Sequence, residues 1–193
     1  PTVKDKIDYI NDMNPAPLSI YSSILALESF LVYVNTTNQD MISTLQQKIN
    51  TNTKAILTVN LFGHPSRLIE LKNIAEKNNI ILIEDNSQAP GSFYKNKLSG
   101  TVGDMGVHSL NYHKVIQTGE GGMLLTNNQN LLDEVNIYKH DGRRERGIDI
   151  IERAGYNFRI TELQTAIGLA QFEKLSTIIE KKINNNECYK ALL

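Results

Sequence analysis

The sequence predicts an α/β fold built on a mainly parallel sheet. Short apolar runs alternate along the chain with segments whose apolar residues recur at helical spacing. Helical segments lie between the first three runs, as crossovers between parallel strands require. The chain shows no internal repeat, no low-complexity tract and no obvious linker. These observations favour helices packed on one sheet within a single domain of ordinary size.

Five apolar runs have the length and composition of buried strands. They are "SFLVYVNT" (29–36), "KAILTVNLFG" (54–63), "NIILIED" (79–85), "MGVHSL" (105–110) and "GGMLLTN" (121–127). Before the first run, "MNPAP" (13–17) carries two prolines that stop any helix. We therefore expect the regular structure to begin after residue 17.

Four segments have apolar residues spaced as on one face of a helix. These residues are Ile42, Leu45 and Ile49 in the first; Leu68, Leu71 and Ala75 in the second; and Leu131, Leu132, Val135 and Tyr138 in the third. The last helix begins at Thr161, which has the spacing of a capping box with Gln164.

Composition limits the classes of partner. The formal net charge of −1 gives no electrostatic reason to expect nucleic acid or an anionic membrane surface. No apolar run approaches the length of a membrane span. Cys188 is the single cysteine, so no intrachain disulfide can form and we expect a cytoplasmic protein. The chain begins at Pro1 and ends within a helical pattern, and we expect it to be a piece of a longer protein.

Polar residues follow three of the predicted strands. They occupy 60–63, 84–88 and 109–114. In sheets of this kind, ligands bind beyond the carboxyl ends of the strands, so these three loops should converge on one edge. Glu84 and Asp85 end an apolar run, and at least one of the two carboxylates should reach that edge.

Several familiar sites do not fit the sequence. A phosphoacceptor receiver domain is excluded because the next aspartate, Asp104, precedes its strand instead of ending it. The four histidines are scattered and none pair at helical spacing, so no metal site is predicted. "GEGG" lacks the lysine–serine pattern of a phosphate loop. Ser87 and Ser109 lack the glycine-flanked turn of a hydrolase nucleophile.

Asp85, Ser109 and Lys114 suggest a different chemistry. A lysine can bond covalently to an aldehyde cofactor when its surroundings lower the pKa of its amine. Pyridoxal phosphate also needs a carboxylate for its ring nitrogen, donors for its phosphate and a group against its ring. The aspartate and the serine would supply the first two. The alternative is that Lys114 is an ordinary solvated loop residue.

Two blocks of sequence resemble the DegT/DnrJ/EryC1/StrS family. "TKAILTVNLFGHPSRLIELKNIAEKNNIILIEDNSQAPGSFYKNKLSGTVGDMGVHSLNYHKVIQTGEGGMLLTNN" is similar to its central part, and "GYNFRITELQTAIGLAQFEKL" (155–175) to its next block. Its members are pyridoxal-phosphate-dependent aminotransferases acting on nucleotide-linked keto-sugars. The resemblance runs from about Ile24 to Leu175. It implies the large domain of the aspartate-aminotransferase fold (fold type I).

The resemblance also implies roles for five residues. Asp85 would hold the pyridinium nitrogen, and Gln88 would lie against the cofactor ring and its hydroxyl. Ser109 would donate to the phosphate, and Lys114 would carry the covalently bound cofactor. Asn157, in "GYNFR", matches the residue that reaches the phosphate of the neighbouring subunit, although it could equally be a helix-entry residue. The glycines after Lys114 would let the backbone pass closely beneath the cofactor.

The chain also departs from the family pattern. The glycine–threonine phosphate turn and the small C-terminal domain are absent, and Pro17 stands near the place of an aromatic that stacks on the cofactor. We therefore expect residues 1–17 to be a poorly patterned segment and residues 18–193 to be a truncated large domain that binds pyridoxal phosphate. Alone, the chain should be inactive. A non-catalytic remnant stays an alternative.

The resemblance implies partners as well. They are a nucleotide-linked keto-sugar, an amino donor (glutamate by analogy) and a second subunit in a homodimer with a shared active site. "TGEGGM" and "AIGLAQFE" resemble members that aminate C4 of a GDP-linked 4-keto-6-deoxy sugar. One branch replaces the lysine with histidine and dehydrates its sugar. His113 lies beside Lys114, but the lysine position is intact, which favours transamination over dehydration.

Overall fold

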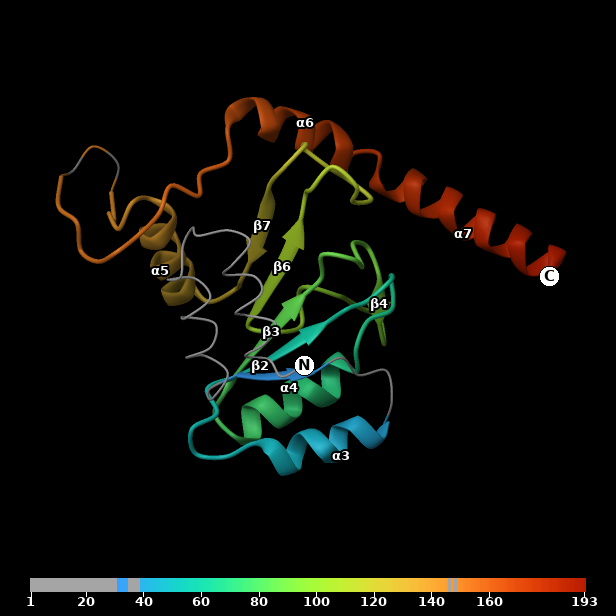
Figure 1. Cartoon of the computed structure of the whole chain (residues 1–193), viewed down its shortest axis with the longest axis horizontal. Coiled ribbons are helices and arrows are strands. Elements are labelled where there is room, and N and C mark those ends of the chain that lie inside the picture. Colours follow the sequence, from blue (N-terminus) through green and yellow to red (C-terminus); the bar gives the residue numbers. More distant parts are fainter. Residues whose placement is uncertain (1–30, 35–38, 146, 148) are drawn as a thin grey trace, which may run out of the picture.

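The sheet is mainly parallel. The computed structural model of the 193-residue chain describes residues 31–34, 39–145, 147 and 149–193. Five strands follow one another across the sheet in the order β1-β2-β3-β6-β7: β1 (Leu31–Val34), β2 (Ala55–Val59), β3 (Ile81–Asp85), β6 (Met105–Ser109) and β7 (Gly122–Leu125) (Figure 1). The first four are parallel, and β7 is antiparallel to β6. The predicted α/β class is confirmed.

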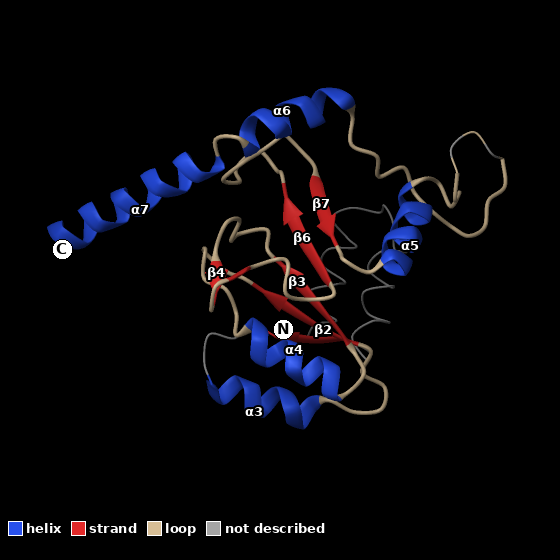
Figure 2. Cartoon of the chain, turned by 180° about the vertical axis from the view of Figure 1, so that it is seen from behind, coloured by secondary structure: helices blue, strands red, loops and turns tan. Residues whose placement is uncertain are grey.

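Two groups of helices surround the sheet. The connections between its first three strands form α3 (Gln39–Lys48) and α4 (Leu68–Lys77), which lie together against one face (Figures 1 and 2). After β7 come α5 (Gln129–Lys139), α6 (Glu162–Phe172) and α7 (Leu175–Leu192). α6 lies beyond the ends of β6 and β7 that face the Lys114 loop, and α7 runs outward from it (Figure 1). No helix in the described ranges is long and apolar enough to cross a membrane.

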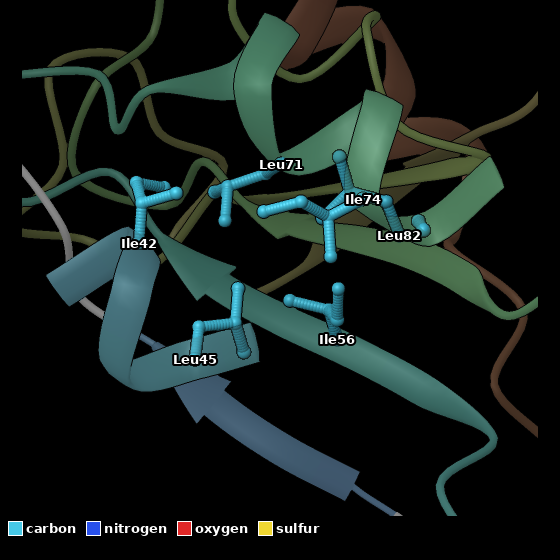
Figure 3. Close-up of a cluster of buried hydrophobic side chains, with 7 residues drawn as sticks. Ile42, Leu45, Ile56, Leu71, Ile74 and Leu82 are labelled. Atoms are coloured by element: carbon cyan, nitrogen blue, oxygen red, sulfur yellow. The ribbon is translucent and has the colours of Figure 1, made fainter. Parts of the chain in front are cut away.

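The core lies between α3, α4 and the sheet. Its buried side chains come from both helices and from β2 and β3 (Figure 3): Ile42, Leu45, Leu71, Ile74, Ala75, Ile56 and Leu82. Four of these residues, including Leu45 at 2% exposure, were predicted from helical spacing. Burial of such side chains stabilises the fold by roughly 1.5–3 kcal/mol each. The core therefore fixes the strands whose ends carry the polar loops.

Some features differ from the prediction or lie beyond it. The third helix is confirmed as α5, but it buries Ile137, while Leu132 and Tyr138 of the predicted face are 37% and 48% exposed. The capping box of Thr161 and Gln164 is present at the start of α6. The expectations for residues 1–17, Pro17 included, lie outside the described residues.

A short antiparallel hairpin, β4 (Phe93–Tyr94) with β5 (Lys97–Leu98), is fastened to α4 through Glu70. The Tyr94 hydroxyl donates to Glu70 at 2.8 Å, and the Lys95 amine does so at 2.9 Å. Burial raises the pKa of Glu70, but hydrogen bonds from Lys95, Arg67 and Tyr94 outweigh it and lower that pKa from 4.5 to about 2. The ionised carboxylate therefore holds the hairpin.

Because of Glu70, the free energy of unfolding should depend on pH in the acid range. Its pKa is lower when folded, so its contribution is complete above about pH 4.5 and is lost as pH falls toward 2. We expect Glu70→Gln to flatten the pH dependence of the unfolding free energy in this window, measured by urea denaturation. Glu180→Gln, at an exposed site on α7, is the control. Parallel curves for Glu70→Gln and the unmodified chain would contradict this role.

Candidate functional site

The carboxyl ends of β3 and β6 place Asp85 and Ser109 on one face of the sheet. Asp85 is the last residue of β3 and pairs with Val107 of β6. Side chains alternate between faces along a strand, so Val107, Ser109 and Asp85 share a face. Asp85 Oδ1 accepts the Ser87 N–H at 3.0 Å, and no described residue donates to Oδ2. This free oxygen suits the ring nitrogen of a cofactor.

Lys114 lies in a closed loop that follows β6. Backbone hydrogen bonds of 2.9 Å, from Leu110 to Gly121 and from Thr118 to Leu110, join the two sides of the loop. Within it, the Lys114 N–H donates to the Asn111 carbonyl at 3.0 Å. The Lys114 side chain is half-buried, and its amine has no hydrogen-bond or ion-pair partner among the described residues. The structure thus presents a lysine whose amine is uncommitted.

α6 supports this loop from outside. The Gln164 side chain donates to the Glu120 carbonyl at 2.8 Å. A Cβ at Gly168 would lie 3.2 Å from Thr118, so the absence of a side chain there lets α6 pack closely on the loop. Thr118 is itself buried and donates from its hydroxyl to Glu120 at 2.8 Å. The segment matching the family's second block therefore buttresses the lysine loop.

The glycines after Lys114 serve the turn itself. Gly119 and Gly121 have φ values of +82° and +146°, where other residues are strained. A Cβ at Gly121 would lie 2.9 Å from the Thr118 hydroxyl, and one at Gly122 would lie 3.0 Å from the His108 carbonyl. These are contacts within the chain. The loop needs glycines to close, whether or not a cofactor also lies close to it.

Gln88 is exposed and is joined to the turn after β2. Its Oε1 accepts the Phe62 N–H at 3.3 Å, and its carbonyl accepts the Gly63 N–H at 3.0 Å. The side-chain amide NH₂ has no partner among the described residues. It can donate to a ring hydroxyl, the role that the family resemblance implies for Gln88.

Glu84 is fully buried, and sequence reasoning did not foresee its surroundings. Its Oε1 accepts the N–H groups of Val102 and Gly103 at 2.8 and 2.7 Å. Its Oε2 accepts the Gly100 N–H at 2.6 Å and the Asn60 amide at 3.3 Å. With both oxygens occupied, Glu84 has no acceptor to offer a ligand. Of the two carboxylates ending β3, the structure leaves Asp85 for that task.

Asn86 and Ser99 extend the Glu84 network. Asn60 donates to Asn86 Oδ1 at 3.0 Å, the Ser99 hydroxyl donates to the same atom at 2.8 Å, and Asn86 donates back to the Ser99 carbonyl at 3.1 Å. All three side chains are buried. Together they lock the ends of β2 and β3 to the loop that precedes β6. Hydrogen bonds between residues this far apart in the sequence cannot be predicted from the spacing of apolar residues.

His108 lies on the Glu84 face of the sheet, away from Ser109. Gly106 pairs with Glu84, and His108 is two residues further along the same strand. Burial lowers the pKa of His108, although the charges of Glu84 and Asp85 act to raise it. The imidazole is therefore neutral at neutral pH. Its Nε2 has no hydrogen-bond partner in the described residues.

Asn157 is not joined to the other four predicted residues. It is exposed, forms an isolated bridge with His140, and accepts the Arg159 N–H at 3.4 Å. It lines a separate cavity of about 570 Å³ together with Arg143 and Arg159. Asp85, Ser109, Lys114 and Gln88 thus belong to one edge of the fold.

A mainly parallel sheet with a strand-end aspartate and a lysine loop on the adjacent strand defines a domain of the fold-type I pyridoxal-phosphate enzymes. The chain belongs to the DegT/DnrJ/EryC1/StrS aminotransferase family, whose model matches residues 21–193. This confirms the resemblance inferred from the sequence.

Two relatives of this chain are sugar-modifying enzymes of known name, and this chain matches part of each. GDP-perosamine synthase of Escherichia coli O157:H7 is 41% identical over 159 residues, covering 81% of this chain and 43% of the relative. The structure of Helicobacter pylori PseC, an aminotransferase of pseudoaminic acid biosynthesis, matches with 30% identity and a TM-score of 0.66, covering 70% of this chain and 37% of that one. The chain therefore spans less than half the length of these relatives.

A third relative catalyses a different reaction. The E. coli GDP-4-keto-6-deoxy-D-mannose-3-dehydratase, solved with bound hydrated pyridoxal phosphate, matches with 27% identity and a TM-score of 0.69. The match covers 82% of this chain and 52% of that one. Its bound cofactor agrees with the cofactor that the sequence predicts. Because the relatives include both aminotransferases and a dehydratase, the type of reaction has to be inferred from the residues of the candidate site.

Proposed function

We propose that this chain is the cofactor-binding part of a pyridoxal-phosphate-dependent aminotransferase. The enzyme moves an amino group from an amino acid, glutamate by family analogy, to a nucleotide-linked keto-sugar for deoxyamino-sugar and surface-polysaccharide synthesis in the cytoplasm. The observation that carries the proposal is the uncommitted amine of Lys114, which lies in a loop beside the strand ends of Asp85 and Ser109. Family membership and the aminotransferases among the relatives support it.

Each residue has a task that its surroundings allow. Bound pyridoxal phosphate supplies an electron sink for the bond changes at the substrate carbon. Asp85, through its free Oδ2, keeps the ring nitrogen protonated. The Ser109 Oγ accepts the Asn111 N–H at 3.3 Å, which leaves its own hydroxyl proton to donate to the phosphate.

Gln88 and Lys114 act at the ring and at the reacting carbon. The Gln88 NH₂ donates to the ring hydroxyl. Lys114 would hold the cofactor covalently, and its amine would move the proton at the substrate carbon as general acid and base. The amine can do this because no described residue holds it in an ion pair.

A dehydratase of the same family is the second candidate, favoured by the third relative. Lys114 argues against it, because the dehydrating branch has histidine at this position. The test is product analysis on a full-length enzyme containing this chain, given nitrogen-15 glutamate and a GDP-linked 4-keto-6-deoxy sugar. We expect the label at C4 of the sugar. Loss of the C3 hydroxyl without incorporation of the label would assign the dehydratase.

We propose further that the enzyme is a homodimer in which Asn157 reaches the phosphate held by the partner. Two observations support this arrangement. Asn157 is exposed and its printed partners, Arg159 and His140, are not among the other four predicted residues; no residue of α6 is buried, with Leu163 and Leu169 exposed by 80% and 65%. A second subunit would cover such a face. Sedimentation velocity showing a cofactor-loaded monomer would contradict the dimer.

A further inference from the structure

The turn after β2 exposes an aromatic side chain in a strained conformation. Phe62 is 90% exposed and has φ +52°, followed by Gly63 at +81°. The His64 N–H closes the turn on the Leu61 carbonyl at 2.8 Å. Two successive positive φ values define a type I′ turn, whose first central position favours Asn, Asp or Gly. Neither folding nor solubility gives a reason for phenylalanine there.

This strained turn is fastened to the candidate site. Its two central N–H groups, those of Phe62 and Gly63, both donate to Gln88. Residues held in sparsely populated conformations cluster at ligand sites, because the surrounding structure must hold them there. Gln88 therefore holds the backbone of the turn that carries Phe62.

Phe62 lines an open cavity of about 440 Å³, a volume typical of small-molecule sites. Gln88 and Val115, the residue after Lys114, line it from the body of the fold, and Ile179 and Lys182 line it from α7. α7 comes this close because Gly91 has no side chain, since a Cβ there would collide with Ile179.

The cavity is suited to an anion with a planar ring. Among the described residues that line it, Lys182 is the only one with a charge, so no carboxylate there opposes an anion. Lys182 is exposed and forms no ion pair with a described residue. A lysine amine can pair with phosphate oxygens, and an exposed phenyl ring can stack on a heteroaromatic base.

We propose that Phe62 and Lys182 form the subsite for the nucleotide of the sugar substrate, with Phe62 stacked on the base and Lys182 paired with the diphosphate. This subsite rests on the proposed function, because it supposes a nucleotide-linked substrate. Its place beside Gln88 and Val115 would leave the sugar directed toward the Lys114 loop.

The test uses GDP as the probe and titration calorimetry on this chain. We expect Phe62→Gly to raise the Kd for GDP about tenfold, as loss of one stacking contact does. The same change relaxes the turn, so the melting temperature should stay the same or rise. Lys182→Gln should also weaken the binding of GDP several-fold, and this loss of affinity should be smaller at high salt. Phe93→Leu and Lys97→Gln, at exposed hairpin sites outside this cavity, are matched controls.

Several results would overturn the subsite. They are a Kd for GDP unchanged in Phe62→Gly, equal weakening in the control variants, and no binding of GDP up to millimolar concentration. Phe62→Gly that weakens pyridoxal phosphate but not GDP would assign the ring to the cofactor and also overturn it. Covalent capture of pyridoxal phosphate on Lys114, tested separately, shows whether the proposed function stands when the subsite fails.

Discussion

Replacement of Lys114 by alanine is expected to lower the amino-transfer rate of a full-length enzyme containing this chain by at least about 10²–10⁴-fold, the contribution of a positioned general acid–base. The loss should be in kcat, because the substitution removes the proton-moving amine and the covalent anchor together. The fold should survive, since the Lys114 side chain is half-buried and has no described partner. Steady-state kinetics and circular dichroism check both parts.

Lys97→Ala is the matched control, because Lys97 is an exposed lysine on the hairpin. It should leave kcat unchanged. Added methylamine should restore part of the rate to Lys114→Ala, since a small amine can occupy the space left by the side chain and move the proton. A Lys114→Ala enzyme that keeps more than a tenth of its kcat would contradict the role assigned to Lys114.

Replacement of Glu84 by alanine should have the largest effect on stability. It leaves the N–H groups of Gly100, Val102 and Gly103 and the Asn60 amide without their acceptor. Each buried donor left unsatisfied costs roughly 1–3 kcal/mol, so we expect a loss of about 4 kcal/mol or more. Domains of this size have only about 5–15 kcal/mol of stability. Urea denaturation should therefore show a chain near the limit of folding.

Glu84→Gln separates charge from shape. One amide oxygen can still accept from Val102 and Gly103, but the NH₂ group then faces the Gly100 N–H, which was 2.6 Å from a carboxylate oxygen. We expect an intermediate loss of about 2–3 kcal/mol. Glu173→Ala, at an exposed position after α6, is the control and should change stability by less than about 0.5 kcal/mol. Equal losses in Glu84→Ala and Glu173→Ala would contradict the network's importance.

Periodic features of the fold could be predicted from the sequence. Ile42, Leu45 and Leu71 recur at helical spacing, and the structure buries all three. Local spacing also gave the Thr161 capping box. The two-residue strands of the β4–β5 hairpin are too short to show a period. The turn residues Lys95 and Asn96 have positive φ values of +46° and +62°. Lysine is not a residue that such turns favour, so the sequence did not indicate a turn there.

The role of Glu84 could not be predicted, because its donors are far away in the sequence. Glu84 and Asp85 are adjacent acids at the end of one strand, and only the fold distinguishes them. The three backbone N–H donors to Glu84 lie 16 to 19 residues further on, in a loop without a periodic pattern, and the Asn60 amide lies 24 residues before it. The strained Phe62 was missed for a similar reason: its partner, Gln88, is 26 residues away.

Part of the candidate site followed from a general rule for parallel sheets, that ligands bind beyond the carboxyl ends of the strands. This rule predicted that Asp85 and Ser109 lie at one edge, and the structure shows that they end neighbouring parallel strands. The glycines after Lys114 have a further role that the sequence did not indicate. Gly121 and Gly122 avoid contacts with Thr118 and His108 of the chain itself, while their closeness to a cofactor stays a prediction.

The central claim is that Lys114 anchors pyridoxal phosphate. The most direct test is borohydride reduction of the chain after incubation with the cofactor, followed by peptide mapping of the label. We expect the label to concentrate on Lys114 and to disappear in Lys114→Ala. Label scattered over many lysines, both in this chain and in a chain extended to the length of its relatives, would contradict the claim.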